Sequence, residues 1–161
     1  DKLNLRLGFM KLWGEFTDFK DAIGYTPVLG DDGQPAGGNT LYVFDATGQK
    51  IIRTPLYTLS ASANYTVDLA DGGEVIFSAN AYHAGKEYRD ADNRVTIPAY
   101  TVVNGEIGYR LPDSRVKLSL WGRNLFNEVY NLYILTGGTA DSTVYARPRS
   151  FGVRLDMEFG R

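Results

Sequence analysis

The chain has 161 residues, enough for one ordinary domain, and it combines 43% apolar residues with 18 glycines, 11 tyrosines and 8 phenylalanines. A net charge of only −2, without any basic stretch, excludes the electrostatic footprint of a nucleic-acid partner. The absence of cysteine excludes disulfides and thiolate metal sites, and the single histidine, His83, weighs against a metal centre. We therefore expect no cofactor, and the surplus of glycine and aromatic residues favours short strands over helices.

The apolar runs are too short for membrane helices. None approaches the roughly 18 consecutive apolar residues that mark such a helix. A barrel strand needs only about ten residues of alternating polarity, so the chain is either soluble or crosses a membrane as strands. It begins at Asp1 rather than at a methionine with a leader, which we interpret as the start of a mature or excised piece.

Alternation of apolar and polar residues predicts six strands. They cover about residues 3–19, 57–69, 74–88, 103–111, 116–123 and 151–159. The second alternates without error, because seven apolar residues at odd positions from Tyr57 to Leu69 enclose six polar residues. The sixth alternates as strictly, and its polar face carries Arg154, Asp156 and Glu158. A slip of one residue would exchange the two faces of such strands, so this pattern specifies the pairing register.

The connections between the predicted strands alternate in length. Short turns are expected at residues 70–73 and 112–114, and long connections cover residues 21–55, 86–99 and 127–148. Three structureless loops of this size would be unusual in a compact soluble domain. Short periplasmic turns and longer extracellular loops are the pattern of an outer-membrane barrel, and this orientation places the carboxyl terminus on the periplasmic side.

Four segments carry a resemblance to a known family. They are Ile52–Pro55, Ile97–Asn104, Leu120–Tyr130 and Ala146–Val153. In this order and spacing they resemble the end of the barrel of a TonB-dependent receptor, over roughly Thr54 to Phe159. In that family the phrase Asn-Leu-Phe-Asn marks where the penultimate strand leaves the membrane, and Arg-Pro-Arg-x-Phe-Gly opens the last strand.

The residues of these two motifs are expected to shape strand ends. The resemblance places the motifs and the end of the last strand at Asn124, Leu125, Phe126, Asn127, Pro148, Phe151, Gly152 and Phe159. Asparagine side chains bond the local backbone where a ladder ends, and proline, which lacks an N–H, is tolerated at the first residue of a strand. We therefore predict a structural rather than a ligand-binding role for both motifs.

The resemblance implies an all-β fold, an antiparallel transmembrane β-barrel segment of about six strands within a barrel of about 22 strands. Six strands leave two open edges, whose unpaired backbone groups are costly in lipid, so we expect other strands to complete the barrel. The implied partners are the remaining strands and the plug of the same receptor, outer-membrane lipid, and TonB. The plug and the TonB-contacting box have no counterpart in residues 1–161, which we interpret as the C-terminal portion of the barrel. The family usually ends on an aromatic residue, whereas Gly160 and Arg161 follow Phe159 here.

The best ligand-binding candidates lie in and just after the last long connection. They are Tyr130, Tyr133, Tyr145, Arg147 and Arg149. Tyrosine and arginine offer rigid apolar area with directed hydrogen-bond donors, which suits an anionic or aromatic chelate. The alternative interpretation is that extracellular loops and barrel rims are rich in aromatic residues without binding a ligand. Asp90 and Asp92 could bind Ca²⁺, but their spacing is not that of an EF-hand and solvated loop charge is the favoured interpretation.

No catalytic motif accompanies these features. The chain has no Gly-x-Ser-x-Gly elbow, and its single histidine makes a catalytic triad improbable, so we do not expect an enzyme. The resemblance implies a receptor of the bacterial outer membrane for energised uptake of a scarce ligand. A ferric siderophore complex is the family's commonest cargo, and cobalamin, haem and glycans stay open. The alternatives are a small structural or adhesive outer-membrane barrel and a soluble lipocalin-like binder.

Overall fold

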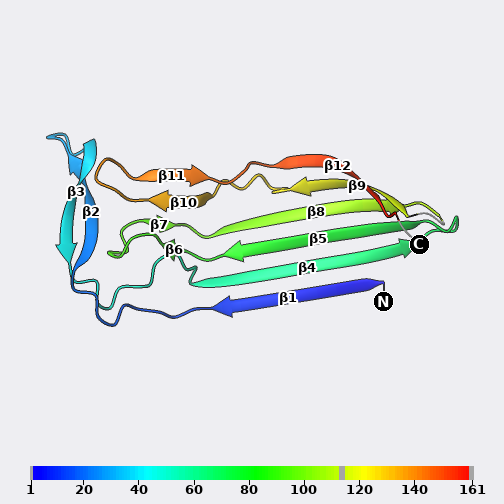
Figure 1. The fold of residues 1–161 in the computed structure, drawn as a ribbon, viewed down its shortest axis with the longest axis horizontal. Helices are drawn as coiled ribbons and strands as arrows, with labels where there is room; N and C mark the ends of the chain where they lie inside the picture. Colours follow the sequence, from blue (N-terminus) through cyan, green and yellow to red (C-terminus); the bar gives the residue numbers. More distant parts are fainter. Residues whose placement is uncertain (1, 113–114, 160–161) are drawn as a thin grey trace.

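The computed structural model describes residues 2–112 and 115–159, and its principal element is one antiparallel sheet. The strands of this sheet, here called the wall, are β1 (Leu3–Lys11), β4 (Tyr57–Asp68), β5 (Glu74–Ala84), β8 (Tyr100–Arg110), β9 (Val116–Arg123) and β12 (Ser150–Met157). They lie in the order β1-β4-β5-β8-β9-β12, so consecutive long strands are neighbours. Figure 1 shows an open wall with β1 and β12 at its edges. No helix among the described residues is long and apolar enough to cross a membrane.

The pairing register sorts the wall into one apolar and one mainly polar face. An apolar row crosses all six strands through Leu3, Tyr65, Phe77, Ile107, Leu120 and Val153. These side chains are 41% to 65% exposed. The neighbouring row on the opposite face consists of Asn4, Asn64, Ser78, Glu106, Trp121 and Gly152. The register that the alternation predicted therefore keeps the two kinds of residue on separate faces.

The apolar face is not part of a protein core. The fully buried apolar residues among those described are few and lie toward one end of the wall: Ala22, Ala46, Ala84 and Ile97. A soluble sheet buries one face against a second layer, and no described segment covers the apolar face here. Such a wall suits an apolar surrounding, in which paired strands satisfy the backbone and the side chains meet lipid.

Each of the three long connections contains a two-stranded hairpin. The hairpins are β2 (Ala22–Leu29) with β3 (Pro35–Phe44), β6 (Glu87–Tyr88) with β7 (Thr96–Ile97), and β10 (Asn131–Leu135) with β11 (Ser142–Tyr145). The long connections that the sequence predicts are therefore not structureless, because antiparallel pairing satisfies much of the backbone locally. Figure 1 shows all three hairpins at one end of the wall, with hairpin β2–β3 standing across that end.

Two wall strands end at least four residues before the alternation predicts, and β12 ends at Met157 rather than at Phe159. β1 ends at Lys11 rather than near Phe19, because its partner β4 begins at Tyr57 and the chain beyond pairs irregularly with residues 49–56. β5 ends at Ala84 rather than at Tyr88, because Tyr88 pairs with Thr96 in a separate hairpin. In both strands the partner, and not the local pattern, sets the end.

The turn between β4 and β5 has the chemistry that its residues predict. Gly72 has a φ of 85°, in the left-handed region that glycine adopts without strain, and its N–H donates to Leu69 O at 3.1 Å. The Asp71 carboxylate accepts from the Gly73 N–H at 2.9 Å. Asp113 and Ser114 of the other predicted turn lie outside the described residues, as do Gly160 and Arg161. Figure 1 places the β4–β5 turn, the start of β1 and the end of β12 opposite the hairpins.

Candidate functional site

The segment after β9 leads from the wall to hairpin β10–β11 through two asparagines with left-handed backbones. Asn124, with a φ of 50°, is 5% exposed, and its side chain accepts from Glu128 N–H at 2.8 Å and donates to Glu128 O at 2.9 Å. It also donates to Arg147 O at 3.3 Å. Asn127, with a φ of 55°, accepts from Arg149 N–H at 3.0 Å. The two motifs of the sequence therefore contact each other, and these bonds hold the entry of β12 against the exit of β9.

The other motif residues lie at the start of β12 or on the surface. Gly152 lies against the Trp121 ring, where an added Cβ would come within 2.4 Å of a ring carbon. The Leu125 N–H donates to Val103 O at 2.8 Å, which ties the turn to β8. The remaining motif residues are exposed: Phe126, Pro148, Phe151 and Phe159. Pro148 precedes the first residue of β12 by two positions, so it is not itself in the strand.

The tyrosines of the ligand-binding prediction have separate surroundings. Tyr130 stacks on Tyr100, with ring centroids 4.1 Å apart and planes 13° from parallel. Tyr133 instead lies beside two guanidinium groups, those of Arg89 and Arg53. Tyr145, in β11, pairs with Asn131 and is 61% exposed. The structure therefore distributes these three side chains over the hairpin end instead of gathering them in one pocket.

The two predicted arginines belong to the entry of β12. The Arg149 guanidinium lies 5.7 Å from the Phe151 ring centroid, and one of its nitrogens donates to Leu125 O at 3.5 Å. Arg147 contributes its carbonyl oxygen to Asn124. The arginines beside Tyr133 come from other connections, Arg53 before β4 and Arg89 after β6. Arg53 is 80 residues from Tyr133, so no local motif could have joined the two.

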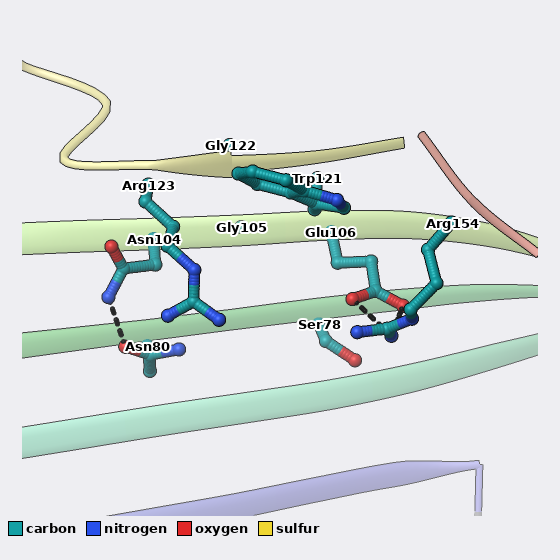
Figure 2. Close-up of a pocket in the computed structure, with 9 residues that line it drawn as sticks. All are labelled: Ser78, Asn80, Asn104, Gly105, Glu106, Trp121, Gly122, Arg123 and Arg154. Carbon is teal, nitrogen blue, oxygen red and sulfur yellow. Dashed lines mark hydrogen bonds and ion pairs between the residues drawn. The ribbon is translucent and has the colours of Figure 1, made fainter. Parts of the chain in front are cut away.

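The polar face of the wall holds a cavity of about 340 Å³ near the β9 and β12 edge. Figure 2 shows the side chains that line it on one side of the sheet: Ser78, Asn80, Asn104, Glu106, Trp121, Arg123 and Arg154. One Arg154 nitrogen lies 2.6 Å from both Glu106 carboxylate oxygens. Lys117 Nζ lies 3.1 Å from the same carboxylate. The Asn104 side chain donates a hydrogen bond to the Asn80 side chain at 2.8 Å. The surface therefore contains ion pairs and hydrogen bonds between side-chain amides, which a hydrated channel tolerates.

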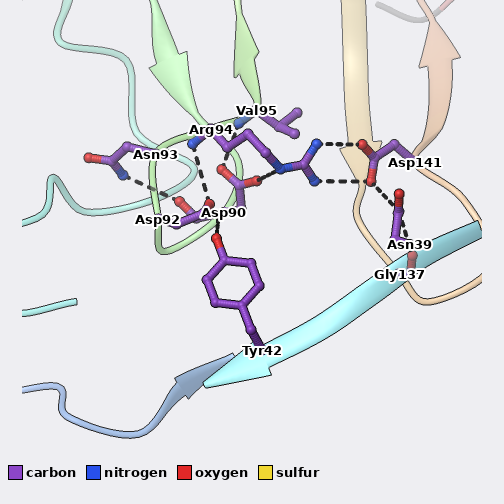
Figure 3. A network of polar contacts seen from close by, with 9 residues as sticks. All are labelled: Asn39, Tyr42, Asp90, Asp92, Asn93, Arg94, Val95, Gly137 and Asp141. Carbon is purple, nitrogen blue, oxygen red and sulfur yellow. Dashed lines mark hydrogen bonds and ion pairs between the residues drawn. The ribbon is translucent and has the colours of Figure 1, made fainter. Parts of the chain in front are cut away.

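Beyond the wall, a polar network joins the three hairpins (Figure 3). Arg94, between β6 and β7, donates to the Asp141 carboxylate at 2.8 and 3.3 Å, and its Nε lies 3.7 Å from Asp90 Oδ2. Asp141 precedes β11 and also accepts from the Asn39 side chain of β3 at 3.0 Å. The Tyr42 hydroxyl, also from β3, donates to Asp92. Each hairpin region therefore bonds directly to another hairpin through at least one side chain.

The network perturbs the titration of its members. Burial raises the pKa of Asp90 to about 6, and the neighbouring Asp92 carboxylate adds to the rise. The hydrogen bond to Asp92, with burial, raises the pKa of Tyr42 to about 12. Asp90 is only 7% exposed and accepts from Val95 N–H at 2.8 Å. The interpretation of this acidic pair as solvated loop charge is therefore wrong for Asp90, because its carboxylate is buried and accepts a backbone hydrogen bond within its own connection.

These surfaces present charged, aromatic and amide side chains. Among residues 2–112 and 115–159, no group of three or more His, Asp or Glu side chains is placed to hold a metal ion. His83 lies on the apolar face, with its ring nitrogens 3.2 Å from Tyr57 Oη and 2.8 Å from Thr101 Oγ1. The groups that can meet a ligand are the arginines, tyrosines and amides of the polar face and the hairpins. They can pair with charge and stack on aromatic groups.

Comparison with known proteins places this geometry in a family. The family model described as TonB dependent receptor-like, beta-barrel matches residues 3–125, about three quarters of the chain. A search of curated protein sequences gives no significant match. Because the family match covers five of the six wall strands and the first two hairpins, it rests on the same elements that build the two-faced wall.

Solved structures give the same fold. The ferric yersiniabactin uptake receptor FyuA from Yersinia pestis aligns with a TM-score of 0.66 at 21% identity, over 76% of this chain and 20% of the receptor. The siderophore receptor PiuA from Acinetobacter baumannii aligns with a TM-score of 0.67 at 23% identity, over 96% and 19%. BauA, the ferric preacinetobactin receptor of the same species, gives 0.55 at 18% identity, over 73% and 18%. The chain thus spans about a fifth of these receptors, and the predicted all-β, antiparallel segment of a larger barrel is confirmed.

Proposed function

The chain belongs to the family of TonB-dependent receptor β-barrels, and we propose that it forms part of the wall and mouth of an outer-membrane receptor for energised uptake of a ferric siderophore complex. The observation that carries this proposal is the wall itself, which has one continuous exposed apolar face and one polar face. A barrel that separates lipid from a hydrated lumen needs this arrangement. A soluble binder would bury the apolar face.

The orientation follows from the two ends of the wall. Outer-membrane barrels have short turns on the periplasmic side and longer connections outside. The short β4–β5 turn, the start of β1 and the end of β12 lie at one end, and the three hairpins lie at the other. We therefore place the hairpins at the extracellular mouth and the carboxyl terminus of the chain on the periplasmic side.

The polar face would line the path of the ligand. Its cavity and charge pairs, including Glu106 with Arg154, would face the receptor's plug, and the remaining strands of the receptor would close the barrel from the β1 and β12 edges. Energy would reach the plug through TonB. In this role the chain recognises and transports, and it has no catalytic part.

The cargo is proposed from the family and from chemistry at the mouth. Three receptors of similar fold carry siderophore or ferric siderophore names, and the hairpin end here offers arginine and tyrosine groups suited to an anionic chelate. Glycans would need planar aromatic platforms with many neutral polar partners. The cluster of two guanidinium groups around Tyr133 favours an anionic cargo instead.

Whole-cell uptake tests the proposal. Cells without siderophore receptors of their own would express the full-length receptor that contains this chain and would receive radioactive iron bound to different siderophores. We expect accumulation of at least one complex, and its loss when TonB is deleted. Uptake that persists without TonB would indicate a passive or structural barrel. If the purified receptor were a monodisperse monomer in buffer without detergent, the proposal that the wall spans a membrane would be wrong.

A further inference from the structure

Two guanidinium groups meet one tyrosine ring where three connections come together. The Arg89 Cζ lies 4.5 Å from the ring centroid of Tyr133, and the Arg53 Cζ lies 5.7 Å from it. Arg53 Nη2 also donates to the Tyr133 hydroxyl at 3.3 Å. We call these three residues the Tyr133 cluster. It joins the segment before β4, the segment after β6, and β10.

The two guanidinium groups of the cluster carry two positive charges, and the neighbouring Glu87 carboxylate neutralises one of them. The side chain of Arg89 is 5% exposed and pairs with Glu87 at 2.7 Å, from Nη1 to Oε1. Its Nε reaches Ile134 O at 3.5 Å, and its Nη2 has no hydrogen-bond partner among the described residues. A buried N–H without an acceptor costs free energy, more so on a charged group. An acceptor brought by a ligand would remove this cost.

The backbone of Arg53 is held in an unusual conformation at this place. Its φ of 59° lies in the left-handed region, which few residues other than glycine and asparagine adopt. The Arg53 N–H donates to Tyr88 O at 2.8 Å, which fixes the residue beside hairpin β6–β7. Arg53 is exposed, whereas Arg89 beneath the ring is not. Strain of this kind is retained where the surroundings determine the position of a side chain.

We propose that the Tyr133 cluster is an oxyanion-binding subsite that takes a carboxylate group of the incoming ferric chelate. Arg53 and the Tyr133 hydroxyl meet the oxyanion from the exposed side, and the free Nη2 of Arg89 becomes a further donor when the ring turns aside. Guanidinium groups match a carboxylate with two parallel bonds, and such charge-assisted bonds are stronger than neutral ones. The subsite rests on the proposed function, because it takes the mouth as the point of entry of the ligand.

A direct titration tests the subsite independently of transport. The full-length receptor that contains this chain would be purified in detergent with 3-fluorotyrosine at position 133, and its fluorine resonance would be followed while citrate is added. We expect a saturable shift. Arg53→Gln should weaken citrate binding about tenfold or more, as the loss of a charge-assisted bond predicts. Arg89→Gln should do the same if the receptor still folds. The exposed Arg53 keeps the test decisive if it does not.

The matched control is Lys11→Gln. Lys11 is the last residue of β1 and also lies beside an aromatic ring, with its Nζ 4.5 Å from the Trp13 centroid, but away from the polar-face cavity and the Tyr133 cluster. This variant should leave the titration unchanged. A wild-type receptor without a saturable shift, or one whose shift survives Arg53→Gln, would overturn the subsite. A shift with lipopolysaccharide micelles but not with citrate would show that the subsite binds an anionic lipid group, and it would contradict the proposal that the ligand is a chelate. Citrate binding in a receptor that takes up no ferric complex would contradict only the proposed function.

Discussion

The wall and the hairpins use different kinds of contact. β4 and β5 pair without interruption over eleven residue pairs, whereas β6 and β7 pair over two. Between wall strands, backbone ladders and rows of apolar side chains repeat from one strand to the next. Between hairpins, the contacts are isolated polar pairs, such as Arg94 with Asp141 and Asn39 with Asp141.

This difference determines what each region can do. Ladders in lipid are hard to open, because every broken bond leaves an unsatisfied group without water. Polar bonds at a wet surface exchange with water at little net cost and respond to charge and pH. The wall is thus suited to a fixed boundary, and the hairpins to recognition and movement. Substitutions in the two regions should therefore differ in their free-energy cost and in how strongly their effects depend on salt and pH.

The largest effect is expected on the apolar face. Leu120 lies between Ile107 and Val153 in the row that crosses the wall and is 63% exposed. Leu120→Arg should lower the free energy of unfolding by about 2–4 kcal/mol if this side chain lies near the bilayer midplane. Urea unfolding of the full-length receptor in lipid vesicles measures it. The control is Asn64→Arg on the polar face, which should cost far less. Equal effects would contradict the assignment of the faces.

A smaller effect is expected where the wall joins hairpin β10–β11. Asn124→Ala removes three side-chain bonds of a buried residue and retains its left-handed backbone, so it should cost about 2–3 kcal/mol. Asn124→Gly separates the two causes, because glycine adopts this backbone without strain and should cost less. The same unfolding measurement applies. An alanine variant as stable as the wild type would show that these bonds contribute nothing.

Local pattern predicted the wall well and the hairpins poorly, for physical reasons. A strand between lipid and water must alternate apolar and polar residues with period two. The run from Tyr57 to Leu69 alternates in this way without exception. The end of β1 depends on where β4 begins, which alternation cannot reveal. In the hairpins, left-handed backbones at Gly33, Gly37 and Gly38 accompany the β2–β3 strands, where the sequence predicted only a long glycine-rich connection.

The candidate site was predicted only in part for a related reason. The residue type of Tyr133 and its place in a long connection point to a binding role, but its cationic neighbours come from two other connections. Arg147 and Arg149 are near the tyrosines in sequence, whereas in the structure they lie at the entry of β12. Contacts between segments 80 or 102 residues apart, such as Arg53 with Tyr133 and Asn39 with Asp141, leave no local signal.

A pH change should loosen the hairpins and spare the wall. The pKa of Asp90 is raised from 3.8 to about 6 where the hairpins pack, so the packed state binds a proton that the opened state has lost. The stability that this proton contributes is fully present below about 3.8 and is lost as the pH rises through about 6. Hydrogen exchange near Val95, corrected for intrinsic rates, should show less protection at about pH 7.5 than at about pH 4.5.

Asp90→Asn is the control for this titration, because the amide resembles the protonated acid. It should remove most of the pH dependence near Val95, and exchange in β4 should not change with pH in either protein. Protection that grows between these two pH values, or a parallel change in β4, would show that Asp90 does not control the packing of the hairpins.

The smallest effect is expected from single ion pairs, and here the same chemistry can be compared in both regions. Arg94→Gln removes a two-bond pair between groups that are each 28% exposed and should favour hairpin opening by about 1 kcal/mol. Arg110→Gln removes a pair with Glu74 across β5 and β8, with exposures of 46% and 34%, and should change wall stability by less than about 0.5 kcal/mol. Hydrogen exchange at low and high salt measures both, and salt should weaken only a pair that contributes. If Arg110→Gln loosened its strands as much as Arg94→Gln loosens the hairpins, ladder pairing would not be what holds the wall, and the contrast between the two regions would fail.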